Sequence, residues 1–350
     1  MNIVQVVPSL KPCGPVNVAS DLVKVFSEKG HHCYVIYFDE TIKKVNFNAE
    51  CFHISEYHRI PWDEIDIIHA HGYRPSKFLL KIKRVYPQIK RVSTLHNYVF
   101  QDFKFEYGFV KGFFASLLYC YVLRKSGSAI VTLSKDALAY YKPLFPNRQL
   151  FYSYNSRRLS SRLIDESETA LIEEFRGGGI LLGVVSVLTK RKNISSIIRA
   201  LPLLPNNMKL CIVGDGKEKC KLEKLVNNLR TQDRVLFLGS REDASRYMKY
   251  FDAYLLTSKS EGFPLSIIEA AASKCRIVSY SLPMIMEVFK NKTDIILCEK
   301  LNPVVLSKCI VEALNMPNLG INAYKTYLEN FTLDELYYRH MNIYNSIINK

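Results

Sequence analysis

The chain has 350 residues, of which 48% are hydrophobic, and its formal net charge is +15. This length and hydrophobic content indicate a globular protein with room for two domains, each with its own core. The nine cysteines lack the spacing of zinc ligands, which argues against a zinc protein. No apolar run reaches the roughly 20 residues of a membrane helix, which argues against a membrane-spanning protein. The N-terminus has the pattern of a strand, which argues against a signal peptide. Scattered, unpaired cysteines also predict reduced thiols in a cytoplasm.

Strand-like apolar runs alternate with helix-like stretches along the whole chain. In the first half the runs are NIVQVV, CYVIYF, IDIIHAH, RVSTLH and SAIVTLS. In the second half they are GILLGVVSVL, KLCIVGDG, RVLFLGS, AYLLTS, RIVSYS and DIILCE. This alternation predicts an α/β protein in which each half is a Rossmann-like domain built on a parallel sheet.

The polar stretch 155–177 lacks the strand pattern and predicts the domain boundary. We therefore expect an N-terminal domain over residues 1–160, a C-terminal domain over 161–330, and a last helix, 331–350, that crosses back to the first domain. Glycines 177–179 precede a strand and are predicted to form a hinge or linker.

A basic and aromatic region covers residues 74–125. Eleven Lys or Arg residues stand there against Asp102 and Glu106, which gives a net charge of +9. Aromatic residues interleaved with cations are typical of an anionic membrane surface. Two alternatives to a membrane surface stay open. The region could bind nucleic acid, which only its charge supports, or it could be an ordinary helix with aromatic residues in the core and lysines in solvent.

Ligands of open α/β sheets bind at the carboxyl ends of the strands, so polar residues and glycines there are candidates. Gly14, after the first strand, lets the backbone approach a ligand at the start of a helix. His69 and His71 are predicted to be hydrogen-bonded core histidines. His96 ends its strand beside Asn97, at an edge that faces the predicted cleft, and is a candidate functional residue.

In the second half, the turn Lys190-Arg191-Lys192 follows a strand and places positive charge where a diphosphate could bind. A solvated basic turn is the alternative. The segment GDGKEK contains only Gly214 and Gly216 and does not read as an NAD site.

Residues 261–269, EGFPLSIIE, contain two carboxylates around a predicted helix start at Pro264. Glu269 lies in an otherwise apolar helix pattern, and a buried carboxylate needs either protein donors or a ligand. Free amides and the helix dipole would face a phosphate. We interpret the segment as a nucleotide-sugar site in which Glu269 binds ribose and Glu261 faces the sugar. In the alternative, Glu261 only complements the helix dipole and Glu269 pairs with a cation.

In order, the segments IDIIHAHG, STLHN, AIVTLSK, LTKRKN, CIVGDGKEKCKLEKL, RVLFLG and FDAYLLTSKSEGFPLSIIEAAAS resemble glycosyltransferase family 4, which are retaining enzymes with the GT-B fold. The resemblance implies two Rossmann-like domains that face each other across a cleft, an N-terminal acceptor domain and a C-terminal donor domain. It implies Glu261 and His96 as catalytic residues. The donor-binding residues that it implies are Gly14, Lys190, Arg191, Lys192, Gly214, Phe263, Pro264, Leu265 and Glu269.

The family commonly has an arginine where this chain has Val187, so Lys192 is left with Lys190 or Arg191 to neutralise the leaving diphosphate. The resemblance implies transfer of a hexose or N-acetylhexosamine from a nucleoside diphosphate sugar to a saccharide. Because the basic region lies in the acceptor domain, we expect a lipid-linked acceptor at the inner membrane face, in surface polysaccharide synthesis. No metal, other cofactor or nucleic acid is expected. A nucleotide-sugar epimerase and a non-catalytic nucleotide-sugar-binding subunit are the alternatives.

Overall fold

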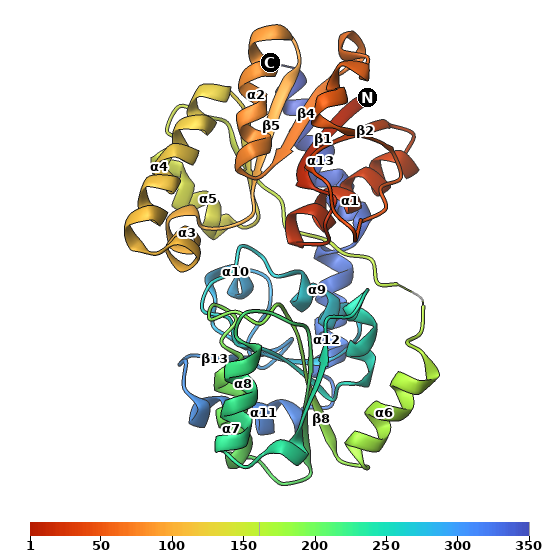
Figure 1. Ribbon diagram of the computed structural model, residues 1–350, viewed down its shortest axis with the longest axis vertical. Helices are drawn as coiled ribbons and strands as arrows, with labels where there is room; N and C mark the ends of the chain where they lie inside the picture. Colours follow the sequence, from red (N-terminus) through yellow and green to blue (C-terminus); the bar gives the residue numbers. More distant parts are fainter. Residues whose placement is uncertain (161, 350) are drawn as a thin grey trace. The chain divides into compact units, whose positions relative to one another are not determined.

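The computed structural model describes residues 1–160 and 162–349. The chain divides into two compact units (Figure 1). The first is Met1–Arg157 together with the segment from Phe331 to the C-terminus, and the second is Arg158–Asn330. The predicted boundary between residues 160 and 161 and the observed division after Arg157 both fall in the polar stretch 155–177.

The first unit contains a seven-stranded parallel sheet in the order β3-β2-β1-β4-β5-β6-β7. Its strands are β1 (Asn2–Ser9), β2 (His32–Asp39), β3 (Glu50–His53), β4 (Ile67–His71), β5 (Lys90–Leu95), β6 (Ala129–Thr132) and β7 (Leu150–Tyr152). Its helices are α1 (Gly14–Glu28), α2 (Tyr73–Val85), α3 (Val99–Tyr107), α4 (Phe109–Ser126), α5 (Lys135–Tyr141) and α13 (Leu333–Ile348).

The second unit contains a six-stranded parallel sheet in the order β10-β9-β8-β11-β12-β13. Its strands are β8 (Ile180–Val185), β9 (Met208–Val213), β10 (Val235–Gly239), β11 (Ala253–Leu256), β12 (Arg276–Tyr280) and β13 (Ile296–Cys298). Its helices are α6 (Glu166–Arg176), α7 (Ile194–Ala200), α8 (Lys219–Asn228), α9 (Leu265–Ala272), α10 (Pro283–Met286), α11 (Pro303–Leu314) and α12 (Leu319–Asn330).

Both sheets are doubly wound because their strand order reverses once, between β1 and β4 in the first unit and between β8 and β11 in the second. Right-handed crossovers then place the helices before and after each reversal on opposite faces of the sheet. The central strands are buried on both faces, as their uninterrupted apolar runs predict. Strands β3 and β7 are short, partly exposed edge strands that the apolar runs did not indicate.

Helix α13 completes the first unit, against α1. The hydroxyl of Thr332 accepts a hydrogen bond from the backbone N–H of Glu335, which caps the helix start, and Asp334 and Glu335 complement the helix dipole. Its buried face includes Leu336, His340 and Tyr344. The segment that is last in sequence is therefore part of the core of the first domain.

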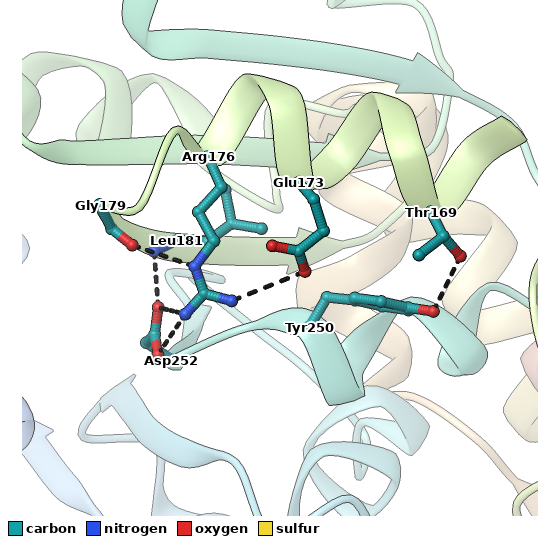
Figure 2. Close-up of polar contacts among 7 residues, drawn as sticks. All are labelled: Thr169, Glu173, Arg176, Gly179, Leu181, Tyr250 and Asp252. Carbon is teal, nitrogen blue, oxygen red and sulfur yellow. Dashed lines mark hydrogen bonds and ion pairs between the residues drawn. The ribbon is translucent and has the colours of Figure 1, made fainter. Parts of the chain in front are cut away.

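Helix α6 is fastened to the start of β8 by a polar cluster (Figure 2). Arg176 donates to the carbonyl oxygen of Gly179 at 3.0 Å and to Asp252 at 2.7 and 2.9 Å. Asp252 also accepts from the backbone N–H of Leu181 at 2.7 Å. Gly177 ends the helix in the left-handed conformation, which glycine adopts readily. The three glycines, predicted to be a hinge or linker, form the turn that joins α6 to β8 within the second unit.

Among the described residues, no single helix has the length and apolar character to cross a membrane. One bent pair of helices, Pro303–Leu314 with Leu319–Ile348, is long and apolar enough by length and composition alone.

Candidate active site

The candidate donor site lies at the carboxyl ends of β8 and β11, the neighbouring strands at which the order of the second sheet reverses. Loops that follow strands on either side of such a reversal leave in opposite directions, and open α/β sheets bind ligands in the crevice between them. The loop after β8 carries Lys190, Arg191 and Lys192, and the loop after β11 carries Glu261.

Glu261 forms ion pairs with two of the three predicted cations. Its Oε1 accepts from Nζ of Lys192 at 2.5 Å, and its Oε2 accepts from Nη1 of Arg191 at 2.9 Å. The Glu261 side chain is 6% exposed, whereas those of Lys192 and Arg191 are 16% and 26% exposed. The cluster thus places a buried carboxylate beneath two cations that solvent can still reach.

Backbone contacts hold the two loops together around this cluster. The backbone N–H of Lys259 donates to the carbonyl oxygen of Arg191 at 2.8 Å, and Arg191 donates to the carbonyl oxygen of Ser260 at 2.6 Å. The hydroxyl of Thr257 donates to the carbonyl oxygens of Lys192 and Asn193 at 3.1 and 3.2 Å. These contacts fix the positions of both cations relative to Glu261 before any ligand binds, and such preorganisation lowers the cost of binding charge.

Glu261 is ionised at neutral pH in this arrangement. Burial alone would raise the pKa of its carboxyl group, but the charges of Lys192 and Arg191 outweigh burial, and the pKa lies below its ordinary value. The site therefore holds a negative charge next to two positive charges, and Glu261 stays unprotonated at neutral pH.

Helix α9 starts where the sequence predicts. Pro264 is its N-cap, with extended backbone, so the amide groups that follow are at the free end of the helix. Glu269 lies on the buried face of this helix and is 9% exposed. Burial raises the pKa of Tyr254 on β11, and the charges of Glu269 and Glu261 add to the shift. Both carboxylates thus lie near enough to this buried phenol for their charges to act on it.

Gly214 lies where the loop after β9 passes directly against the loop after β8. Its φ is +144°, and a Cβ atom built on it would lie 1.9 Å from the carbonyl oxygen of Ser186. Its N–H donates to the carbonyl oxygen of Gly239 at 2.8 Å. The structure therefore gives Gly214 a demonstrable role in loop packing, while its predicted contact with the donor stays a prediction.

The other predicted donor-binding residues of the two loops differ in solvent exposure. Phe263 and Pro264 are buried and Leu265 is partly buried. Lys190 is exposed and takes part in no ion pair among residues 1–160 and 162–349. Of the two partners that the sequence left open for Lys192, Arg191 is the one that shares its carboxylate.

Gly14 and His96 belong to the first unit, at the carboxyl ends of β1 and β5. Gly14 is the first residue of α1, and a Cβ atom there would meet no heavy atom within 4 Å. His96 is partly exposed, and its Nε2 lies 2.9 Å from Nδ1 of His71. His69 and His71 are fully buried and both ring nitrogens of each are hydrogen-bonded, which confirms the prediction that they are core histidines.

Comparison with known proteins bears on what this site does. Residues 167–327 match the family model "Glycosyl transferases group 1". The chain is 29% identical to the O-antigen biosynthesis glycosyltransferase WclY of Escherichia coli, over 99% of each protein. The protein is a glycosyltransferase. The glycosyltransferase is also 35% identical, over 27% of its own length and 26% of the relative's, to the N-acetylgalactosamine-N,N'-diacetylbacillosaminyl-diphospho-undecaprenol 4-alpha-N-acetylgalactosaminyltransferase of Campylobacter jejuni.

A solved structure has the same fold. HepE from Anabaena, determined in complex with UDP and glucose, matches the glycosyltransferase with a TM-score of 0.81 at 17% identity, over 99% of this chain and all of that one. The predicted fold class, two Rossmann-like α/β domains of the GT-B type, is confirmed.

The sequence interpretation missed Gln5 as a residue of interest. Gln5 is 1% exposed, in the middle of β1, and its Oε1 lies 2.8 Å from Nε2 of His71. A signal was available, because a single amide inside the apolar run NIVQVV must find hydrogen-bond partners when the strand is buried.

Proposed function

We propose that the protein is a retaining glycosyltransferase that transfers a hexose or N-acetylhexosamine from a nucleoside diphosphate sugar to a saccharide acceptor in surface polysaccharide synthesis. The observation that carries this proposal is the cluster of Glu261, Lys192 and Arg191 beside the start of α9. The O-antigen role in the name of the Escherichia coli relative supports the assignment to surface polysaccharide, and the UDP and glucose in the HepE structure support a nucleotide-sugar donor.

The charges of the cluster suit both ends of the bond that breaks. When the bond between the sugar carbon and the diphosphate oxygen breaks, negative charge develops on the leaving diphosphate and positive charge on the sugar carbon. In our proposal Lys192, Arg191 and the amides of residues 263–265 bind the diphosphate, and no metal is needed. Glu261 faces the sugar carbon, and Glu269 accepts hydrogen bonds from the ribose hydroxyls.

The acceptor hydroxyl forms the new bond on the face that the diphosphate leaves, which retains the anomeric configuration. Its proton passes to a phosphate oxygen of the departing diphosphate, so no protein base is required. In the acceptor domain, Gly14 leaves room for a ligand beside the start of α1, and His96 contacts the saccharide.

A thermal-shift screen with UDP-, GDP-, ADP- and TDP-sugars tests the donor. A true donor raises the melting temperature in proportion to the logarithm of its concentration above its Kd. Incubation of that donor with lipid-linked saccharides should then yield a product whose anomeric configuration, read by NMR, equals that of the donor. An inverted product would refute retention, and stabilisation by none of these sugars would refute the donor class.

We also propose that the acceptor is lipid-linked and that helices α3 and α4 contact the anionic inner surface of the membrane in the cytoplasm. These helices expose apolar and aromatic side chains, which are Phe105, Tyr107, Phe109, Val110, Phe113, Phe114, Leu117, Leu118 and Tyr121. Lys104 and Lys125 lie over the rings of Phe109 and Tyr121, at 5.1 and 5.7 Å. Exposed rings next to cations suit a headgroup interface, since the rings enter it and the cations pair with anionic lipids. The undecaprenol-linked substrate in the name of the Campylobacter relative supports this choice.

Vesicle sedimentation tests the membrane contact. The wild type should sediment with vesicles that contain phosphatidylglycerol and much less with pure phosphatidylcholine. The double change Phe109→Ser and Phe114→Ser should weaken sedimentation, because it removes two of the exposed rings. Ile42→Ser is the matched control, since Ile42 is an exposed apolar residue of the same unit outside α3 and α4. Equal sedimentation with both vesicle types would contradict this part of the proposal.

A further inference from the structure

A row of four histidines crosses the first unit from α13 to the carboxyl edge of the sheet. His340 lies on α13, His69 and His71 on β4, and His96 just after β5. Their ring centroids are separated by 5.9, 4.5 and 5.2 Å in that order. The proposed function uses only His96, at the end of the row, so the others call for an explanation of their own.

Gln5 determines which nitrogen of His71 carries hydrogen. Its carbonyl Oε1 lies 2.8 Å from Nε2 of His71, and because a carbonyl oxygen can only accept, Nε2 must donate. The amide is turned so that this oxygen, and not the amide nitrogen, faces His71.

The protonated nitrogen of His71 in turn determines which nitrogen of His96 carries hydrogen. Burial lowers the pKa of His71 well below its ordinary value, so the ring is neutral and its Nδ1 is an acceptor. That atom lies 2.9 Å from Nε2 of His96, which must therefore donate. Burial likewise lowers the pKa of His96, to about 3, so its other nitrogen, Nδ1, carries a lone pair and no hydrogen.

Nδ1 of His96 is available to a ligand. Within the part of the chain that the structure describes, no hydrogen bond engages this atom, and the residue is partly exposed at the edge of the sheet. His69 does not compete for His71, because Nδ1 of His69 bonds the hydroxyl of Tyr344 and its Nε2 bonds that of Thr94, both at 2.7 Å.

We propose that Gln5 and His71 are positioning residues that hold His96 as the Nε2-protonated tautomer, so that its Nδ1 accepts a hydrogen bond from a hydroxyl group of a saccharide substrate. The inference rests on the proposed function, which supplies that hydroxyl. The opposite tautomer would present an N–H group instead and would select an acceptor such as a phosphate or carbonyl oxygen. The buried amide of Gln5, which acts through His71, thus determines whether His96 accepts or donates the hydrogen bond to the substrate.

Two measurements test the inference, and the first needs no substrate. Correlation spectra of the protein with ¹⁵N-labelled histidine report which ring nitrogen is protonated, and His96, assigned with His96→Gln, should carry its hydrogen on Nε2 at neutral pH. The second is the rate of nucleoside diphosphate release from whichever of the UDP-, GDP-, ADP- and TDP-sugars the wild type turns over. Gln5→Met removes the acceptor for His71 and should lower kcat by about tenfold with little change in the donor KM, since one hydrogen bond in the transition state is misdirected.

The matched control, His31→Gln, changes a histidine of the same unit outside this row, whose bonds are to Met1 and Tyr337, and should alter neither the His96 signal nor the rate.

Protonation of His96 on Nδ1 in the wild type would overturn the inference even if no variant folds. A shifted tautomer in Gln5→Met with an unchanged rate would overturn the positioning role. A wild type that releases nucleoside diphosphate from none of these sugars would count against the proposed function instead, and the spectra alone would then decide the tautomer.

Discussion

Glu261 and Glu269 are both buried acids of one loop and helix, but their surroundings differ. Glu261 is held between two cations that a diphosphate could also use, whereas Glu269 lies on the apolar face of α9. An ionised carboxylate between cations can respond to charge that develops during the reaction. Glu269, one turn into α9, is proposed to make a contact with the ribose that exists already in the bound state. The two residues should therefore affect different kinetic constants.

Exchange of each carboxylate for an amide separates these roles. Glu261→Gln should lower kcat by about 10²-fold, because the lost charge acts mainly in the transition state. Glu269→Gln should instead raise the Kd of the donor by about tenfold, through the loss of a charge-assisted hydrogen bond. Steady-state kinetics and donor titration by calorimetry give the two constants. Glu299→Gln, an exposed acid of the same unit, is the control, and equal, negligible effects at both buried sites would reject the assignment.

Acid should weaken the ion cluster in a defined pH range. The pKa of Glu261 lies below its ordinary value of 4.5, so its ionised form contributes stability above about that pH and loses it as the pH falls through the folded-state pKa. The melting temperature of Glu261→Gln should be lower than that of the wild type near neutrality, because two cations lose their partner. The difference should shrink below about pH 4.5. A difference that stays constant down to unfolding would contradict the ionised cluster.

The sequence located the residues of the cluster but not their pairing. A carboxylate and a basic turn at neighbouring strand ends could be predicted, because parallel strands end at one edge. Which of Lys190, Arg191 and Lys192 reaches Glu261 depends on the turn itself, where Asn193 has a left-handed φ of 54°. Three consecutive cations carry no periodicity from which that geometry could be read. The same holds for Gln5, whose partner is 66 residues away.

Among the secondary-structure elements, central strands were predictable and edges were not. A buried parallel strand must be apolar on both faces, so β1, β4, β8 and β11 stand out in the sequence. Strand β3 has only Phe52 buried, and β7 has no fully buried residue, so neither has a pattern that distinguishes it from a loop. For the aromatic residues of α4 the sequence left open a membrane surface and a core, and several of them are exposed.

Two glycines at strand ends should respond differently to a methyl group. Gly214→Ala should destabilise the second unit by at least about 2 kcal/mol, because φ is +144° and the Cβ atom would overlap the carbonyl oxygen of Ser186. Gly14→Ala should leave the melting temperature unchanged, since nothing lies within 4 Å of the added atom. If phosphates approach Gly14, this variant should still bind the donor about tenfold more weakly. Unchanged donor affinity in Gly14→Ala would remove that residue from the site.

At the scale of the whole molecule, the row of histidines should make folding sensitive to mild acid. Burial lowers the pKa values of His69, His71, His96 and His340, to about 3 for His96 and about 4 for His340. The folded chain therefore stays unprotonated there while the unfolded chain binds protons below about pH 6.5. Stability is then full above that pH and falls as the pH decreases.

The expected loss is about 1.4 kcal/mol per pH unit for each histidine, between about pH 6.5 and pH 5. Urea unfolding at a series of pH values measures it. His340→Gln should reduce the slope by about one histidine's share. A free energy of unfolding that is flat over this range would show that the four rings are not held neutral.

The path of the chain has a consequence for how the protein is made. Met1–Arg157 leaves the ribosome before Arg158–Asn330, yet α13, which packs against α1 and bonds His69 through Tyr344, leaves it after both. The nascent first domain must wait, with an uncovered apolar face, until the complete second domain has emerged. The first domain can close only once α13 has emerged, so a product that stops before Phe331 lacks the helix that completes its core and exposes a hydrophobic surface to chaperones and proteases.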